Sequence, residues 1–284
     1  YFRENTLRFP SKLKIEKSHN SLNNKTFEII AIPSAVGQSK EAFRLLNNLF
    51  PSESENKNWI ETAVVLPDEN LLLPMLYSLP KQIENVNVTM GFPLKSTPVS
   101  GLVEHIFDLQ KRLRKTAEGA TFYFQTVQSI LHHPYIQLLC KADAEAISEK
   151  IIRENKIFSE REIFAKNPLL NELFVPCEDA IQFLEYLTNL VKKLYQSIQN
   201  VSEEKNQYRL ESNFLYQYYI TLNRLRDVMK KTPAETEFSL DTMIRIIRQL
   251  TSGLSIPFKG EPLDGLQIMG TLETRGLDFE NLII

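Results

Sequence analysis

Residues 267–284 read QIMGTLETRGLDFENLII, and the fold of the chain can be predicted outward from this stretch. An apolar lead-in at 268–269 is followed by a polar turn centred on Arg275 and Gly276 and then by a closing apolar run at 282–284. This order predicts a strand, a loop and a second strand. Glycine adopts a positive φ at no steric cost, and loops at strand ends carry many of the ligand contacts of α/β proteins. The loop is therefore a candidate binding site.

Apolar runs alternate with helical stretches in the first third of the chain. The apolar runs lie at 27–33, 63–66 and 86–90, and the helical stretches lie at 40–50 and 71–79. Strands that alternate with helices indicate a parallel sheet with crossover helices. Because parallel strands are usually covered on both faces, we predict that these strands and those of 266–284 form a single sheet.

Residues 98–254 show helical periodicity almost throughout. Apolar residues recur at helical spacing in three series, at 99–113, 181–198 and 210–229. We expect the resulting apolar faces to pack on one another. The chain then returns to the sheet through a turn-rich connector at 256–266.

Several local signals mark helix ends in this region. Ser159 and Glu162 have the spacing of a capping box, and Gly253 is predicted to cap the carboxyl end of the last helix. His132 and His133 have no glutamate or cysteine at metal spacing. We interpret the two histidines as a helix end rather than as a catalytic or metal site.

Composition limits the classes of function. The chain has 284 residues, of which 43% are hydrophobic, and 33 basic against 35 acidic residues give a net charge of −2. Any contact with nucleic acid must therefore be local. No apolar run reaches the ~18 residues of a membrane span, and residues 1–24 lack the apolar centre of a signal peptide, so we predict a cytoplasmic protein without membrane contact. Cys140 and Cys177 lack metal spacing and are interpreted as buried or incidental thiols.

The sequence contains no recognisable site for ATP hydrolysis. A phosphate loop needs the pattern G-x-x-x-x-G-K-[ST], whereas the loop at 33–40 holds only Gly37. Asp68 and Glu69 follow an apolar strand as in a Walker B site, but no phosphate loop precedes them. Asp68 is better explained as the N-cap of the helix at 71–79. We therefore predict no catalytic residue and no metal site.

Residues 270–284 resemble motif V of the UvrD/RecB class of superfamily 1 DNA helicases. In that motif a T-x-H-x-x-K-G-L-E-F run precedes an apolar strand, and its tail reads RGLDF here, at 275–279. The first Thr of the motif falls on Gly270 and its His on Leu272, so half of the polar groups of the motif are missing.

A second block supports the same resemblance. Residues 62–80 and 85–109 are similar to the part of the second motor lobe in which a strand, a helix and a strand ending in Gly-x-Pro lead into a helical insertion. Gly91 and Pro93 match that turn. The amino-acid sequence of this block most resembles that of AddB-like helicase-nuclease proteins of the Bacteroides group, whose helicase portion is described as inactivated.

The resemblance implies a fold class and a domain organisation. The fold would be α/β, with a RecA-like (P-loop NTPase-type) parallel sheet lobe that is interrupted by a large all-helical insertion. Residues 1–98 would form the first part of the lobe, 99–255 the insertion and 256–284 the return to the lobe. Because the chain starts without Met and stops on an apolar run, we expect it to be a piece of something longer.

The resemblance also implies site residues. Gly276 and Asp278 would form a vestigial nucleotide site, and Thr271, Thr274 and Arg275 would contact DNA. The alternative is that RGLDF is an ordinary turn between two buried strands.

The implied function is a part of a helicase-nuclease for DNA repair and recombination, with neither ATPase nor nuclease site of its own. ATP and Mg²⁺ would bind only together with a first motor lobe. The expected partners are single-stranded DNA, bound weakly and without sequence preference, and a second helicase-nuclease subunit. The basic segment 1–25 is either an arm that meets phosphates or a solvated connector. The rival function is a protein-interaction scaffold that does not bind DNA.

Overall fold

A parallel sheet is built from segments that lie far apart in the sequence. The computed structural model describes residues 25–49, 59–83, 85–117, 119–205, 209–231, 238–257 and 265–284. Within these residues the sheet has the strand order β2-β8-β1-β9. Its strands are β1 (Thr62–Leu66), β2 (Val86–Val88), β8 (Leu266–Gly270) and β9 (Asn281–Ile283), and every neighbouring pair is parallel. The fold is mixed α/β, and the predicted single sheet from both parts of the chain is confirmed for these strands.

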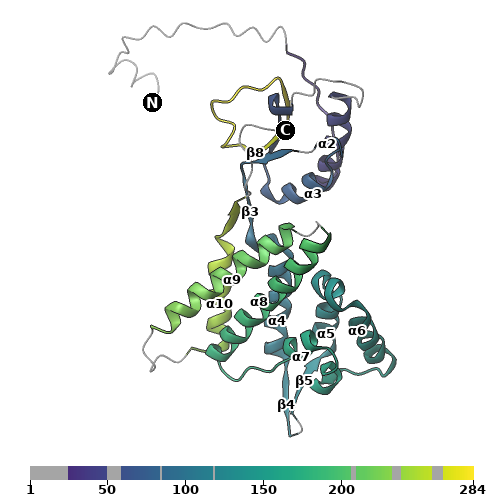
Figure 1. Ribbon diagram of the computed structural model, residues 1–284, viewed down its shortest axis with the longest axis vertical. Helices are drawn as coiled ribbons and strands as arrows, with labels where there is room; N and C mark the ends of the chain where they lie inside the picture. The colour runs from purple at the N-terminus through teal and green to yellow at the C-terminus, as the bar shows by residue number, and fades with distance from the viewer. Residues whose placement is uncertain are drawn as a thin grey trace.

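The two faces of the sheet are covered differently (Figure 1). Side chains alternate along a strand, so Val64 and its register partner Ile268 share one face and Val65 and Met269 share the other. The first face packs against α2 (Ala35–Leu49) and α3 (Leu72–Tyr77). The second face packs against Phe279, which lies in the loop between β8 and β9.

The apolar run at 27–33 forms no strand, so that prediction is wrong. The run leads into α2, and Phe27 and Ile29 are 74% and 97% exposed. The positions beside the central strand β1 are occupied by β8 and β9, and the run at 27–33 pairs with no strand of the described sheet.

Asp68 caps a helix, as the sequence predicts. Its carboxylate accepts a hydrogen bond from the backbone N–H of Asn70 at 3.0 Å. The capped element is the short 3₁₀ helix η3 (Glu69–Leu71), which continues directly into α3.

A two-stranded ribbon joins the parallel sheet to the helices (Figure 1). β3 (Gly91–Pro93) pairs antiparallel with β7 (Ser255–Pro257), so the predicted turn at Gly91 and Pro93 is a short strand instead. The ring of Phe92 stacks on Phe214 with the ring centroids 5.8 Å apart. One apolar cluster therefore continues from the sheet through the ribbon into the helices.

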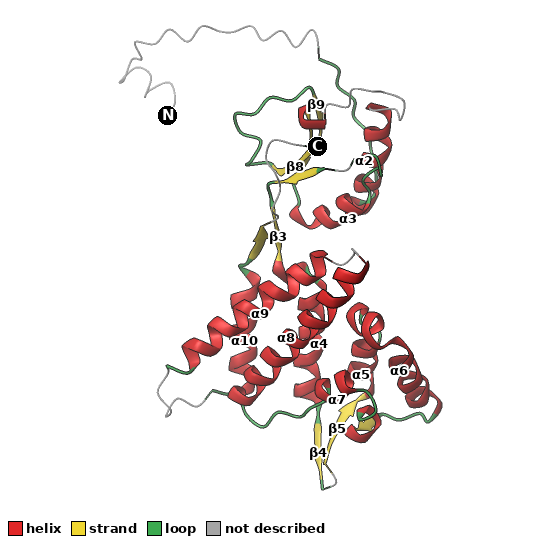
Figure 2. Ribbon diagram, viewed as in Figure 1, coloured by secondary structure: helices red, strands yellow, loops and turns green. Residues whose placement is uncertain are grey.

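Helices form most of the chain between the two halves of the sheet (Figure 2). They are α4 (Pro98–Arg112), α5 (Phe124–Leu131), α6 (Pro134–Arg153), α7 (Pro168–Leu173), α8 (Ala180–Lys205), α9 (Arg209–Met229) and α10 (Leu240–Ser252). His132 ends α5, His133 begins α6 and Gly253 follows α10, so these predicted helix ends are confirmed. Among the described residues, none of the helices combines the length and apolar character needed to cross a membrane.

The region is not all-helical, which corrects the prediction. β4 (Arg114–Thr116), β5 (Gly119–Tyr123) and β6 (Phe158–Glu160) form an antiparallel sheet. The predicted capping box is also wrong, because Ser159 lies buried within β6 and precedes the 3₁₀ helix η5 (Arg161–Phe164). Phe122 and its register partner Ser159 point inward, which makes this a strand pattern of period two.

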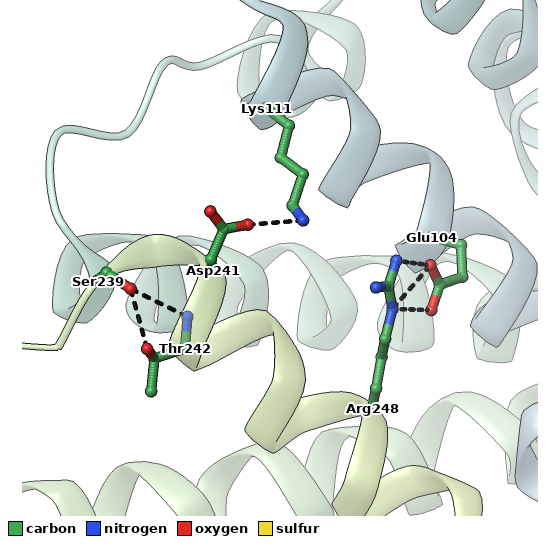
Figure 3. A network of polar contacts seen from close by, with 6 residues as sticks. All are labelled: Glu104, Lys111, Ser239, Asp241, Thr242 and Arg248. Carbon is green, nitrogen blue, oxygen red and sulfur yellow. Dashed lines mark hydrogen bonds and ion pairs between the residues drawn. The ribbon is translucent and has the colours of Figure 1, made fainter.

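Ion pairs hold α10 against α4, the helix that leads away from the parallel sheet (Figure 3). Arg248 Nε donates to both carboxylate oxygens of Glu104, at 2.9 and 3.1 Å, and Lys111 Nζ lies 2.6 Å from Asp241 Oδ1. The outgoing and returning helices are therefore connected at two levels.

Candidate functional site

The loop at 271–280 is the predicted site, and it starts at the carboxyl edge of the parallel sheet. The chain leaves β8, passes β1 and re-enters the sheet as β9 on the far side of β1. Thr274 Oγ1 donates to the carbonyl oxygen of Thr271 at 2.9 Å, and the N–H of Leu277 donates to the carbonyl oxygen of Thr274 at 3.2 Å. The first half of the loop is thus a closed turn.

The five predicted site residues all lie in or beside this turn. Thr274 is half-buried, and the exposed ones are Thr271, Arg275, Gly276 and Asp278. Only Thr271 and Thr274 are joined by a hydrogen bond. Within the described part of the chain, Arg275 and Asp278 have no ion-pair partner. Gly276 has φ +79°, a conformation that glycine adopts at no steric cost.

The second half of the loop is anchored to the sheet. Phe279 packs against Val65 and Met269 on the second face. The N–H of Glu280 donates to the carbonyl oxygen of Glu61 at 2.9 Å, which fixes the entry into β9. The apolar Phe279 beside polar neighbours was a sequence signal for this anchor, whereas nothing in the sequence pointed to the contact with Glu61.

The charge of the loop is acidic. Residues 271–280 contain one basic residue, Arg275, against Glu273, Asp278 and Glu280, which gives a net charge of −2. A Cβ on Gly270 would lie 2.5 Å from Glu273 Oε2, so this carboxylate folds back over the end of β8. An acidic loop repels phosphates at long range. Of the basic segment at 1–25, all but the last residue lies outside the described residues.

Two carboxyl groups meet where the loop enters β9. A side-chain hydrogen bond with Glu61, together with the negative charge of Glu61, raises the pKa of Glu280 above its ordinary value of 4.5. A carboxyl whose pKa is raised by folding stabilises the protein below its ordinary pKa and loses that contribution as the pH rises through the folded pKa.

We therefore expect Glu280→Gln to stabilise the protein at pH 7 and to have no such effect below pH 4.5. Thermal unfolding at both pH values measures the difference. Glu149→Gln, on the exposed face of α6, controls for the loss of one surface carboxylate. If Glu280→Gln raised the thermal stability equally at both pH values, the interaction between Glu61 and Glu280 would be contradicted.

The two cysteines and His133 are further titratable groups that are buried. Cys140 and Cys177 are buried, as predicted, and burial raises the pKa of their thiols to about 11 and about 12. Both are therefore protonated at neutral pH and poor nucleophiles. Burial also lowers the pKa of His133 to about 4, while its Nε2 contacts the carbonyl oxygen of Pro98 at 3.0 Å. Among the described residues, no three His, Cys, Asp or Glu side chains gather as metal ligands.

The geometry defines a class of protein, a mixed α/β chain whose parallel sheet is completed by strands from both sides of a long, mostly helical region. No model of a known protein family matches the chain, and no curated protein matches it.

Proposed function

We propose that the chain is the second RecA-like lobe, with its helical insertion, of a UvrD/RecB-class helicase-nuclease that resembles the AddB-like subunits. The observation that supports this most is the position of β8, which follows the helical region in sequence but lies between β1 and β2, which precede it. A lobe interrupted by an insertion requires this arrangement. Residues 1–98, 99–255 and 256–284 are then the first part of the lobe, the insertion and the return.

The proposed role is DNA contact and scaffolding in DNA repair and recombination. Gly276 and Asp278 would meet a nucleotide from one side only, so ATP and Mg²⁺ chemistry would need a first motor lobe. Thr271, Thr274 and Arg275 would contact single-stranded DNA weakly. The parent protein would be a cytoplasmic helicase-nuclease with exonuclease activity, and a second subunit would be its partner.

One observation favours the rival function, a protein-interaction scaffold without DNA binding. The loop carries three carboxylates and one guanidinium, which opposes phosphate binding. The two functions differ in whether Arg275 neutralises a phosphate.

The test is the salt dependence of single-stranded DNA binding, compared between the unaltered chain and its Arg275→Ala variant. A single phosphate contact on a single strand contributes a slope of about 0.7 in log affinity against log salt. We expect Arg275→Ala to lower the slope by that amount and to weaken binding a few-fold at low salt, as measured by fluorescence anisotropy of a labelled oligonucleotide.

Lys230→Ala, an exposed lysine after α9, is the matched control with the same change in charge. If Arg275→Ala has the same salt slope and affinity as Lys230→Ala, the loop is only a structural turn. The scaffold function would then replace the proposal.

A further inference from the structure

The most basic stretch of the described chain lies outside the candidate site. Residues 111–115 read KRLRK, four cations in five residues, in a chain with a net charge of −2. Lys111 is paired with Asp241 (Figure 3). Arg112, Arg114 and Lys115 are exposed, and no carboxylate among the described residues lies within ion-pair distance of them. We call these three the hairpin cations, because they lie on or beside the β4–β5 hairpin.

Aromatic rings lie directly beneath two of the hairpin cations. The guanidinium carbon of Arg114 is 4.0 Å from the ring centroid of Phe158, and that of Arg112 is 5.8 Å from the ring centroid of Tyr123. The two rings are 5.7 Å apart. Tyr123 and Phe158 are register partners of β5 and β6 and are half-buried, so they lie on the sheet face that points away from the buried Phe122.

This face is open and prominent. The β4–β5 hairpin projects beyond the helices, at the end of the molecule farthest from the parallel sheet (Figure 2). Arg114, Thr121 and Glu160 form one cross-strand row. Since neighbouring strands are ~4.8 Å apart, the backbones of Arg114 and Glu160 lie roughly 10 Å apart in this row. The guanidinium of Arg114 reaches across the face to the ring of Phe158 on β6. Lys115 is the register partner of Ala120 and lies on the opposite face, with Phe122.

We propose that the outward face of the β4-β5-β6 sheet binds single-stranded nucleic acid. Arg112 and Arg114 contact the phosphates. Tyr123 and Phe158 stack with bases, which either replace a guanidinium on its ring or stack on the outer side of the guanidinium. The inference goes beyond the proposed function, because it assigns a second surface and does not depend on contacts made by Arg275.

The pairing of cations with rings selects the ligand. A positively charged surface that carries aromatic side chains is the recurring design of sequence-tolerant binding to single strands, since every base offers a flat face for stacking. In a duplex the base faces are covered by their neighbours, so the rings would contribute nothing. An acidic peptide would satisfy the cations but would leave the rings without a role.

The first experiment neutralises the two arginines together, as Arg112→Ala and Arg114→Ala. Binding to labelled oligo-dT is followed by fluorescence anisotropy over a salt series. Losing two contacts at about 0.7 each should lower the slope by about 1.4 and weaken binding about tenfold at low salt. The matched control neutralises two exposed lysines elsewhere: Lys192→Ala and Lys230→Ala.

The second experiment separates stacking from charge. Phe158→Leu should weaken oligo-dT binding about fivefold or more, with the salt slope unchanged, and should leave binding to a duplex of the same length unaffected. Arg114→Lys keeps the charge but lacks the planar guanidinium. This variant should also bind oligo-dT with an unchanged salt slope and a lower affinity. A thermal unfolding curve for each variant verifies that it is folded, and an oligo-U arm distinguishes RNA from DNA as the preferred strand.

Three results would overturn the proposal. One is no binding to either oligonucleotide at low salt, which would point to an acidic protein partner. Another is an equal loss of affinity in the double arginine variant and the double lysine control. The third is unchanged binding in both Phe158→Leu and Arg114→Lys. Arg275→Ala is measured in the same series, so a failure of the loop and a failure of the hairpin face remain distinguishable.

Discussion

Replacing Gly265 with alanine is expected to destabilise the protein by about 2–5 kcal/mol, from the left-handed backbone cost and the added steric overlap. Gly265 has φ +76°, and a Cβ there would lie 2.1 Å from the carbonyl oxygen of Asn85. That oxygen accepts the N–H of Leu266 at 3.1 Å, a bond that leads into the pairing of β2 with β8. The obstacle is backbone, so relieving the overlap requires the two strands to separate.

Gly276→Ala is the matched control for this substitution. Gly276 has nearly the same conformation, φ +79°, but a Cβ there would have no atom within 4 Å among its surroundings. Gly276→Ala should lower the free energy of unfolding only by the cost of the left-handed backbone, about 1–2 kcal/mol. Urea unfolding measures both variants, and hydrogen exchange of the β8 amides locates the damage. Equal losses in the two variants would show that the contact between Gly265 and Asn85 is not tight.

Truncating Phe122 to alanine is expected to cost about 3–5 kcal/mol, because the ring leaves a cavity that its neighbours cannot fill. Phe122 is fully buried on β5. Its centroid lies 6.2 Å from that of Phe164 and 5.5 Å from that of Phe174, in edge contacts, and those two rings stack on each other at 3.7 Å. The three rings connect the small antiparallel sheet to the helices.

Two further variants sharpen this prediction. Phe122→Leu keeps most of the volume and should cost less than about 1.5 kcal/mol. Tyr123→Ala, on the outward face of the same strand, should cost less than Phe122→Ala, since Tyr123 is half-buried. The measurements are urea unfolding and hydrogen exchange of the β5 amides. A larger loss for Tyr123→Ala than for Phe122→Ala would mean that the strand faces the other way.

The elements that the sequence predicted correctly have strong local signals. β1 and β8 are mostly apolar and are buried at every position, with Thr62 and Gln267 as their polar members, which is typical of strands covered on both faces. Asp68 and Gly253 are chemically suited to helix ends, and the structure uses both in that way. The five candidate residues lie in one loop, because they are close together in the sequence.

The elements that were missed depend on partners far away in the chain. The run at 27–33 has the composition of a strand, yet the strands beside β1 are β8 and β9, which come from the end of the chain. Residues 114–123 lie within the range 98–254, which the sequence predicts to be helical almost throughout. Arg114 to Tyr123 form a hairpin instead, because β6 supplies a third strand and the buried Phe122 gains ring contacts with Phe164 and Phe174.

The sequence by itself determined the α/β class, the parallel strands at both ends of the helical region and the strand-loop-strand at 266–284, because these follow from local periodicity and turn chemistry. Only the tertiary structure decided the strand order β2-β8-β1-β9, the pairing of Glu61 with Glu280 and the rings beneath the hairpin cations. Each of these joins residues whose separation in the chain is large. Such contacts are set by which surfaces can be buried together, a property that no single segment of sequence carries.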